Sequence, residues 1–166
     1  MSEQYEYEYF VDTDPGYTVE RPSSLWRRSG DSWEYLSLLT WEWRRVGGDN
    51  PVRQQPLPEA LHPVTAERAK ELEADRQGWV RYWAEYEDEA AWRAGEAPYS
   101  VVRRRRSPER IYDEAFMATN TWEPTARVFD HFSARADELT YLAEVTPDEA
   151  ERLLRQVRGV SGATDL

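Results

Sequence analysis

The sequence predicts an α+β fold made of two copies of a β-β-β-(β)-α unit, with antiparallel strands and one helix in each copy. Three observations support this: an internal repeat, a strand-like alternation near the N-terminus, and a helix signature that closes each copy. Such a unit is too small to bury a core well by itself. We therefore expect the copies to pack together in a pseudo-twofold arrangement, because a repeat sets the architecture.

The repeat aligns residues 40–78 with residues 121–159. Ten of the 39 aligned positions are identical without a gap, against about two or three expected by chance from average residue usage. The most conspicuous identity is Thr-Trp-Glu, at residues 40–42 and 121–123. The repeat divides the chain into residues 1–77 and 78–166, which we expect to form one compact domain.

The repeat continues upstream with a shorter offset. Residues 22–28 and 98–104 share the pattern Pro-x-Ser-x-x-Arg-Arg, and Asp12 aligns with Asp88. The change of offset places five extra residues in the second copy before Thr121. Insertions are tolerated at loop tips, so we expect a hairpin turn there.

The elements follow from hydrophobic period and turn residues. Alternation of Tyr and Val with other residues predicts a first strand at 5–11, and Gly30-Asp31 fits a hairpin turn. We expect strands at 5–11, 24–29, 32–39, 79–87, 99–106, 110–117 and 139–144, and helices at 66–77 and 147–158. Residues 160–166 are expected to be a frayed tail.

Both helices carry start and stop signals. Thr65 and Thr146 are good N-caps, because a hydroxyl accepts a hydrogen bond from a first-turn amide. Gly78 and Gly159 stand where a left-handed C-cap belongs.

Residues 79–93 have two readings. Their aromatic side chains are also spaced for one helical face, so residues 66–93 fit a single long helix. The repeat favours a strand, because Gly78 aligns with a helix stop and residues 82–88 align with the first strand.

Four large side chains are predicted to anchor the core: Trp41, Trp122, Leu72 and Leu153. The leucines belong to the apolar stripes of the two helices. The tryptophans have an alternative role, stacking on a base, a sugar or a peptide side chain.

Arginines provide the only candidate binding residues: Arg27, Arg28, Arg103, Arg104, Arg105 and Arg106. The functional hypothesis is an anion or acidic-partner site repeated in both copies. The structural alternative is that they pack over aromatic rings and form ion pairs with acidic strands. The run at 103–106 is also the only basic patch that suggests nucleic acid, which a net charge of −11 disfavours.

Composition limits the chemistry further. The absence of cysteine excludes disulfides, thiolate catalysis and zinc–cysteine sites. The acidic N-terminus predicts no signal peptide, and no apolar run is long enough to span a membrane, so we expect a cytoplasmic protein. His62 and His131, the only histidines, do not align between the copies. We identify no catalytic residue, metal ligand or cofactor motif.

Three functional hypotheses remain. The first is a non-catalytic acidic protein-interaction module, such as an immunity-type inhibitor, an antitoxin or an accessory subunit, whose partner is a protein and, from the net charge, a basic one. The second is a small-ligand-binding protein with an aromatic pocket between the repeats. The third is an enzyme that relies on carboxylates and arginine. The sequence sets neither the oligomeric state nor the functional face.

Overall fold

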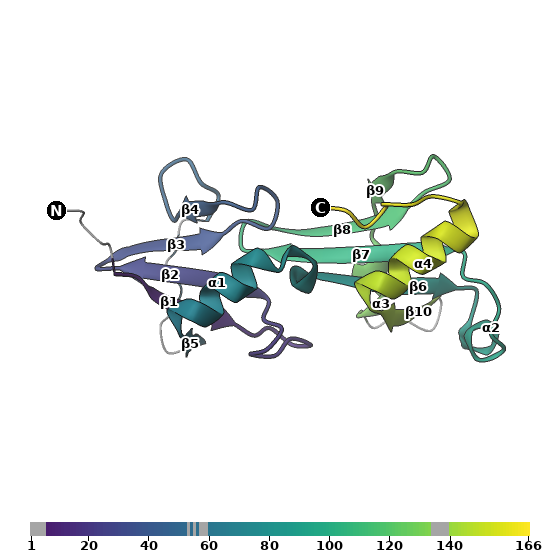
Figure 1. Cartoon of the computed structure of the whole chain (residues 1–166), viewed down its shortest axis with the longest axis horizontal. Helices are drawn as coiled ribbons and strands as arrows, with labels where there is room; N and C mark the ends of the chain where they lie inside the picture. The colour runs from purple at the N-terminus through teal and green to yellow at the C-terminus, as the bar shows by residue number, and fades with distance from the viewer. Residues whose placement is uncertain (1–5, 53, 55, 57–59, 134–139) are drawn as a thin grey trace. The chain divides into compact units, whose positions relative to one another are not determined.

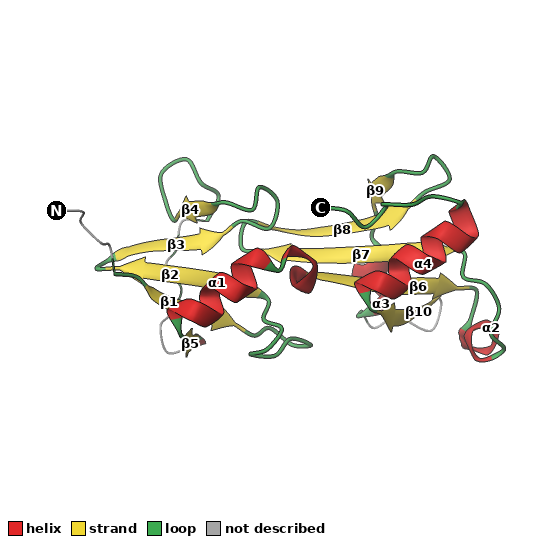
Figure 2. Cartoon of the chain, viewed as in Figure 1, coloured by secondary structure: helices red, strands yellow, loops and turns green. Residues whose placement is uncertain are grey.

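The computed structural model describes residues 6–52, 54, 56, 60–133 and 140–166. In this part of the chain, two five-stranded antiparallel sheets and four α-helices form an α+β fold (Figures 1 and 2). A helix follows each sheet in the sequence, so the predicted fold class is confirmed. The chain divides into two compact units: unit 1 comprises residues 1–79 and 106–111, and unit 2 comprises residues 80–105 and 112–166.

The sheet of unit 1 has the order β4-β3-β2-β1-β5. Its strands are β1 (Glu8–Asp12), β2 (Ser24–Ser29), β3 (Ser32–Leu36), β4 (Trp43–Arg45) and β5 (His62–Val64). Helix α1 (Ala66–Ala74) and a 3-10 turn, η2 (Arg76–Trp79), follow. The predicted first strand begins with Tyr5, which lies outside the described residues. Gly30 turns the chain between β2 and β3 with φ +59°, as a two-residue hairpin requires.

The sheet of unit 2 has the order β10-β6-β7-β8-β9. Its strands are β6 (Val80–Tyr86), β7 (Ser100–Ser107), β8 (Arg110–Phe116), β9 (Trp122–Pro124) and β10 (Tyr141–Val145). Its helices are α2 (Glu89–Arg93), α3 (Arg127–His131) and α4 (Pro147–Arg158). Leu139, the predicted start of the last strand, lies outside the described residues.

Each sheet has an apolar cluster on both faces. In unit 1, α1 covers one face with Leu72, and Leu61 belongs to the cluster on the other face. In unit 2, α4 covers one face with Leu153 and Leu154, and Val128 of α3 covers the other. Figure 1 shows α1 and α4 each lying across its own sheet. No helix in the described part of the chain combines the length and apolar character needed to cross a membrane.

The ambiguous segment at 79–93 is mainly a strand. Tyr82 and Ala84 of β6 pack towards α4, whereas Trp83 packs towards α3. This alternation is the period-two pattern of a strand with two buried faces. Within this segment, only residues 89–93 are α-helical, in the short helix α2.

The two helix N-caps form as predicted, but the two glycines differ. Thr65 Oγ1 accepts from Arg68 N at 3.1 Å, and Thr146 Oγ1 accepts from Glu149 N at 3.2 Å. Gly159 is a left-handed C-cap with φ +68°.

The prediction of a left-handed C-cap is wrong for Gly78, which lies in the 3-10 turn η2 outside the positive-φ region. A Cβ there would lie 2.6 Å from Asp75 Oδ2. Close approach of this carboxylate, rather than backbone handedness, therefore favours glycine.

Strand register corrects the pairing of the tryptophans. Leu36 of β3 lies opposite Trp43, and Phe116 of β8 lies opposite Trp122. The counterpart of Trp122 is therefore Trp43 rather than Trp41. Trp41 sits in the preceding turn with φ +60°, where the second copy has Asn120 with φ +61°.

Register also changes the counterpart of Asp12. Asp12 lies opposite Ser24, and Glu85 lies opposite Ser100. The two units also share the backbone hydrogen bond beside this pair of residues. In unit 1 Ser23 N donates to Asp12 O at 2.9 Å, and in unit 2 Tyr99 N donates to Glu85 O at 2.7 Å. Asp12 therefore corresponds to Glu85 and not to Asp88, which instead caps α2 by accepting from Ala91 N at 2.7 Å.

The hairpin between β7 and β8 holds four extra residues, two in each strand, where the offset of the repeat predicts five. This hairpin has strands of eight and seven residues, against six and five for β2 and β3. Its turn segment, residues 106–111, belongs to unit 1.

The expectation of a frayed tail at 160–166 is wrong. Val160 and Ala163 pack against the core of unit 2, and Thr164 is buried. Trp122 Nε1 donates to Ala163 O at 2.7 Å. The tail is therefore part of the packing around Trp122.

Candidate binding site at the end of the second sheet

All six arginines singled out from the sequence form ion pairs with carboxylates of the chain. The pairs are Arg27 with Glu34, Arg28 with Glu8, Arg103 and Arg105 with Glu114, Arg104 with Asp113, and Arg106 with Asp14. Neighbouring arginines of a strand point to opposite faces, as strand geometry requires. These contacts give every one of the six a structural role, and an external partner for them stays a prediction.

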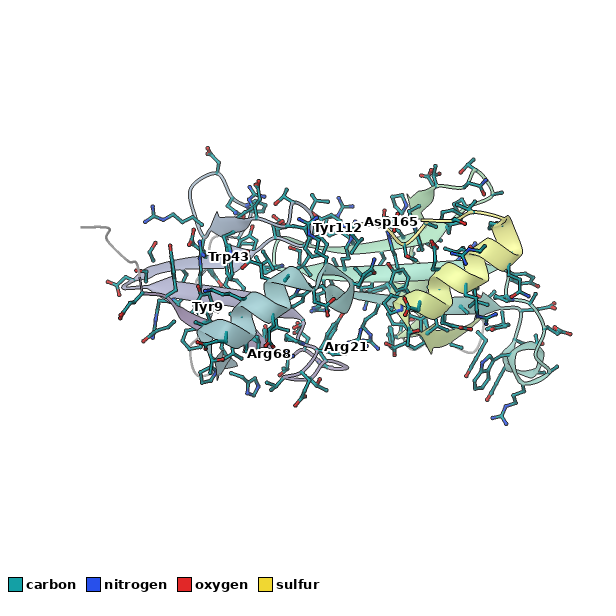
Figure 3. All side chains as sticks on the ribbon, viewed as in Figure 1. Tyr9, Arg21, Trp43, Arg68, Tyr112 and Asp165 are labelled. Carbon is teal, nitrogen blue, oxygen red and sulfur yellow. The ribbon has the colours of Figure 1, made fainter. Side chains whose placement is uncertain are left out.

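In each unit, one of these arginines lies over the tryptophan that corresponds between the two copies, Trp43 or Trp122. In unit 1 the Arg27 guanidinium lies 4.2 Å from the Trp43 ring and 4.1 Å from the Tyr7 ring, with Glu34 Oε1 at 2.8 Å from its Nε. Figure 3 labels Trp43 beside Tyr9, whose ring centroid is 6.1 Å away. Cation–π contact and the ion pair together hold β2, β3 and β4 in register.

Unit 2 repeats this arrangement. The Arg103 guanidinium lies 4.1 Å from the Trp122 ring and its Nε donates to Glu114 at 3.0 Å. Burial lowers the pKa of Arg103, while Glu114 opposes that shift. Tyr82 packs on the same tryptophan with centroids 6.2 Å apart. The duplicated Arg–Trp contact is therefore a structural element of the repeat.

Unit 2 also contains a recess that is lined by both apolar and cationic side chains. Its volume is about 560 Å³. We call it the unit 2 recess, and define it by Glu85, Tyr99, Met117, Arg127, Thr140 and Arg158.

Glu85 lies at the base of the recess near the end of β6. It is 1% exposed and shares a sheet face with Trp83. Arg127 Nη1 donates to its Oε1, and Thr140 Oγ1 donates to its Oε2 at 2.8 Å. A buried carboxylate needs such partners to stay in the fold. Glu85 therefore fixes the positions of Arg127 on α3 and of Thr140 before β10.

The rim of the recess combines apolar and cationic groups. Tyr99 is 51% exposed and Met117 is 39% exposed. Arg158, at the end of α4, donates from Nη2 to Tyr99 O at 3.0 Å, and its buried Nε has no hydrogen-bond partner among the described residues. The Arg127 side chain is 49% exposed. Two guanidinium groups and one carboxylate that is already paired therefore line the recess, beside exposed apolar atoms.

A second cavity, of about 390 Å³, lies in unit 1 at the position that corresponds to the unit 2 recess. Asp12, the counterpart of Glu85, lines it together with residues of the segment 106–111. Burial and repulsion from Asp14 raise the pKa of Asp12. The two cavities differ because that segment lies against the first and no equivalent segment is described at the second.

The recess residues were not identified from the sequence. Glu85 interrupts a strand of mainly apolar residues, and this is the one signal that pointed to it. Tyr99, Met117, Arg127 and Arg158 come together only through the fold.

Among the described residues, no group of three or more histidines and carboxylates is placed to hold a metal ion. No protein-family model, curated protein or solved structure matches the chain.

Proposed function

We propose that the protein is a non-catalytic protein-interaction module, of the kind formed by immunity-type inhibitors, antitoxins and accessory subunits, and that the unit 2 recess is its binding surface. One observation carries the proposal. Tyr99 and Met117 leave apolar surface exposed beside Arg127, in a chain where the arginines of both hairpins have internal partners. Exposed apolar groups beside arginine are typical of the energetic centre of an interface.

The test is an affinity capture that compares three forms of the full chain in extracts of the cell that encodes it. They are the parent, the double variant Tyr99→Ala/Met117→Ala, and the control Leu39→Ala. Leu39 is a 48% exposed side chain of unit 1. We expect a protein that the parent and the control retain and the double variant loses. Equal capture by all three forms contradicts the recess as the site. No captured protein, together with a monomer in solution, contradicts the function.

A small-ligand-binding role is the second candidate. The recess volume of about 560 Å³ lies within the range of ligand pockets. A thermal-shift screen of metabolites against the parent and the Tyr99→Ala/Met117→Ala variant separates the two roles. A ligand that stabilises only the parent supports the second candidate, and a flat screen argues against it.

A further inference from the structure

We propose that the unit 2 recess receives a β-turn that carries a carboxylate, supplied by a different protein. The inference rests on the proposed function and specifies its partner. It comes from the two units, which have the same sheet but differ in what covers one end of it.

In unit 1 that end is covered by the turn of this chain at residues 106–111. Ser107 Oγ accepts from Leu38 N at 3.1 Å and donates to Glu109 at 2.9 Å. Glu109 also accepts from Tyr35 OH at 3.0 Å and from Arg44 Nη1 at 2.8 Å. The Glu109 side chain is only 5% exposed. A carboxylate at a turn is thus the group that this sheet end binds.

The corresponding positions of unit 2 follow from matching hydrogen bonds. Ser37 N donates to Glu42 O, and Met117 N donates to Thr121 O, after strands that pair alike. Ser37 therefore corresponds to Met117, and Leu38 to Ala118.

Exposure at these positions shows which sheet end is covered. Ser37 is 0% exposed, whereas Met117 is 39% exposed; Ser23 is 1% exposed, whereas its counterpart Tyr99 is 51% exposed. Polar residues are buried in unit 1 and larger apolar residues are exposed in unit 2. Apolar side chains at a position that is covered in the sister unit indicate a surface built for a separate segment.

Charge defines what that segment carries. Arg127 and Arg158 border the recess, and Glu85 is already neutralised by Arg127 and Thr140. A carboxylate on the incoming turn would therefore find cationic donors, as Glu109 finds Arg44 in unit 1. The two guanidinium groups favour an acidic turn whose carboxylate lies on the side of Arg127 and Arg158, because the carboxylates of Glu87, Asp88 and Glu96 lie near the Tyr99 hydroxyl. The net charge of the chain, by contrast, suggests a basic partner.

A second copy of this chain is disfavoured as the occupant. The β2–β3 hairpin is the counterpart of the hairpin that covers unit 1, but its strands are shorter by two residues each. The net charge of −11 also opposes association between copies.

The experiment places a photo-crosslinking amino acid at Met117 in the full chain and, as a control, at Leu39. After irradiation in the cell that encodes the protein, mass spectrometry identifies the cross-linked peptide. We expect a peptide of another protein, with an Asp or Glu in a turn, at Met117 and not at Leu39. A cross-link to a second copy, to a helix, or to a segment without a carboxylate overturns the inference.

Charge variants complete the test. Arg127→Gln should weaken capture of the partner at least tenfold, and Arg93→Gln, on the exposed helix α2, should leave it unchanged. Arg127→Gln alone leaves the buried carboxylate of Glu85 without its ion-pair partner. The double variant Glu85→Gln/Arg127→Gln removes that charge too, so a fold defect caused by the unpaired carboxylate is absent from it. A partner that depends on Tyr99 and Met117 but not on Arg127 overturns the acidic turn and leaves the proposed function standing. A chain that captures nothing overturns both.

Discussion

At the scale of single residues, Glu109 is the most consequential carboxylate of unit 1. Burial opposes its ionisation, but hydrogen bonds from Ser37, Ser107 and Tyr35 outweigh burial and lower its pKa from the ordinary value of 4.5. Its contribution to stability is therefore present above pH 4.5 and is lost as the pH falls through the lowered pKa. Asp12 acts in the opposite direction, because its pKa is raised.

We expect Glu109→Gln to reduce the free energy of unfolding at neutral pH by about 1–3 kcal/mol, because it removes a buried, hydrogen-bonded charge. The difference from the parent should shrink as the pH falls below 4.5. Urea denaturation across this range measures both effects, with Glu42→Gln on the exposed surface as the control. A difference that does not change with pH would show that the charge of Glu109 contributes nothing.

The glycines that follow α1 and α4 should respond differently to the same substitution. Gly159→Ala forces an alanine into the left-handed region, at roughly 1–2 kcal/mol. Gly78→Ala should cost about 1 kcal/mol, because the new Cβ displaces the Asp75 carboxylate from its bond to Gly78 N. Asp75→Ala should therefore reduce the cost of Gly78→Ala and leave the cost of Gly159→Ala unchanged. Equal effects of Asp75→Ala on both, in denaturation curves of the four variants, would contradict these causes.

At the scale of elements, Trp122 links β9, β8 and the C-terminal segment. Its ring lies 5.2 Å from the Phe116 centroid, and its indole N–H donates to Ala163 O. A local pattern predicted both helix N-caps, because a cap depends on residues within one turn. The role of Trp122 depends on a strand and on a tail 41 residues away.

We expect Trp122→Ala to destabilise the chain by about 3–5 kcal/mol, the usual cost of removing a large aromatic side chain from a core. Trp122→Phe should cost less, because it keeps a ring under Arg103 and loses only the bond to Ala163. Removing residues 160–166 tests the tail separately, by the same thermal melt. A melt in which Trp122→Ala matches the parent would disprove the core assignment.

At the scale of the whole molecule, unit 1 is not a continuous stretch of sequence. It includes residues 106–111, which bring Glu109 to Tyr35 and Arg44. Here the contacts of the turn make one unit depend on residues that follow it in the chain.

We therefore expect the fragment 1–79 to be less stable than the same residues in the full chain, because Leu38, Ser37 and Tyr35 lose their cover. Circular dichroism melts and amide hydrogen exchange measure the difference. A peptide of residues 100–116 added to the fragment should restore part of the protection, and the same peptide with Glu109→Ala should restore less. A fragment that is already protected like unit 1 in the full chain would refute the dependence.

The sequence by itself determined the α+β class, the repeat, the hairpins and the starts of α1 and α4, since these depend on alternation, turns and N-caps within a few residues. It paired Trp41 with Trp122 because identity along a gap-free alignment takes no account of strand register. Only the tertiary structure placed Trp43 opposite Leu36 and Glu85 opposite Ser100. It also brought Arg127 to Glu85, because that contact joins a helix to a strand far away in the sequence, and no local pattern encodes it.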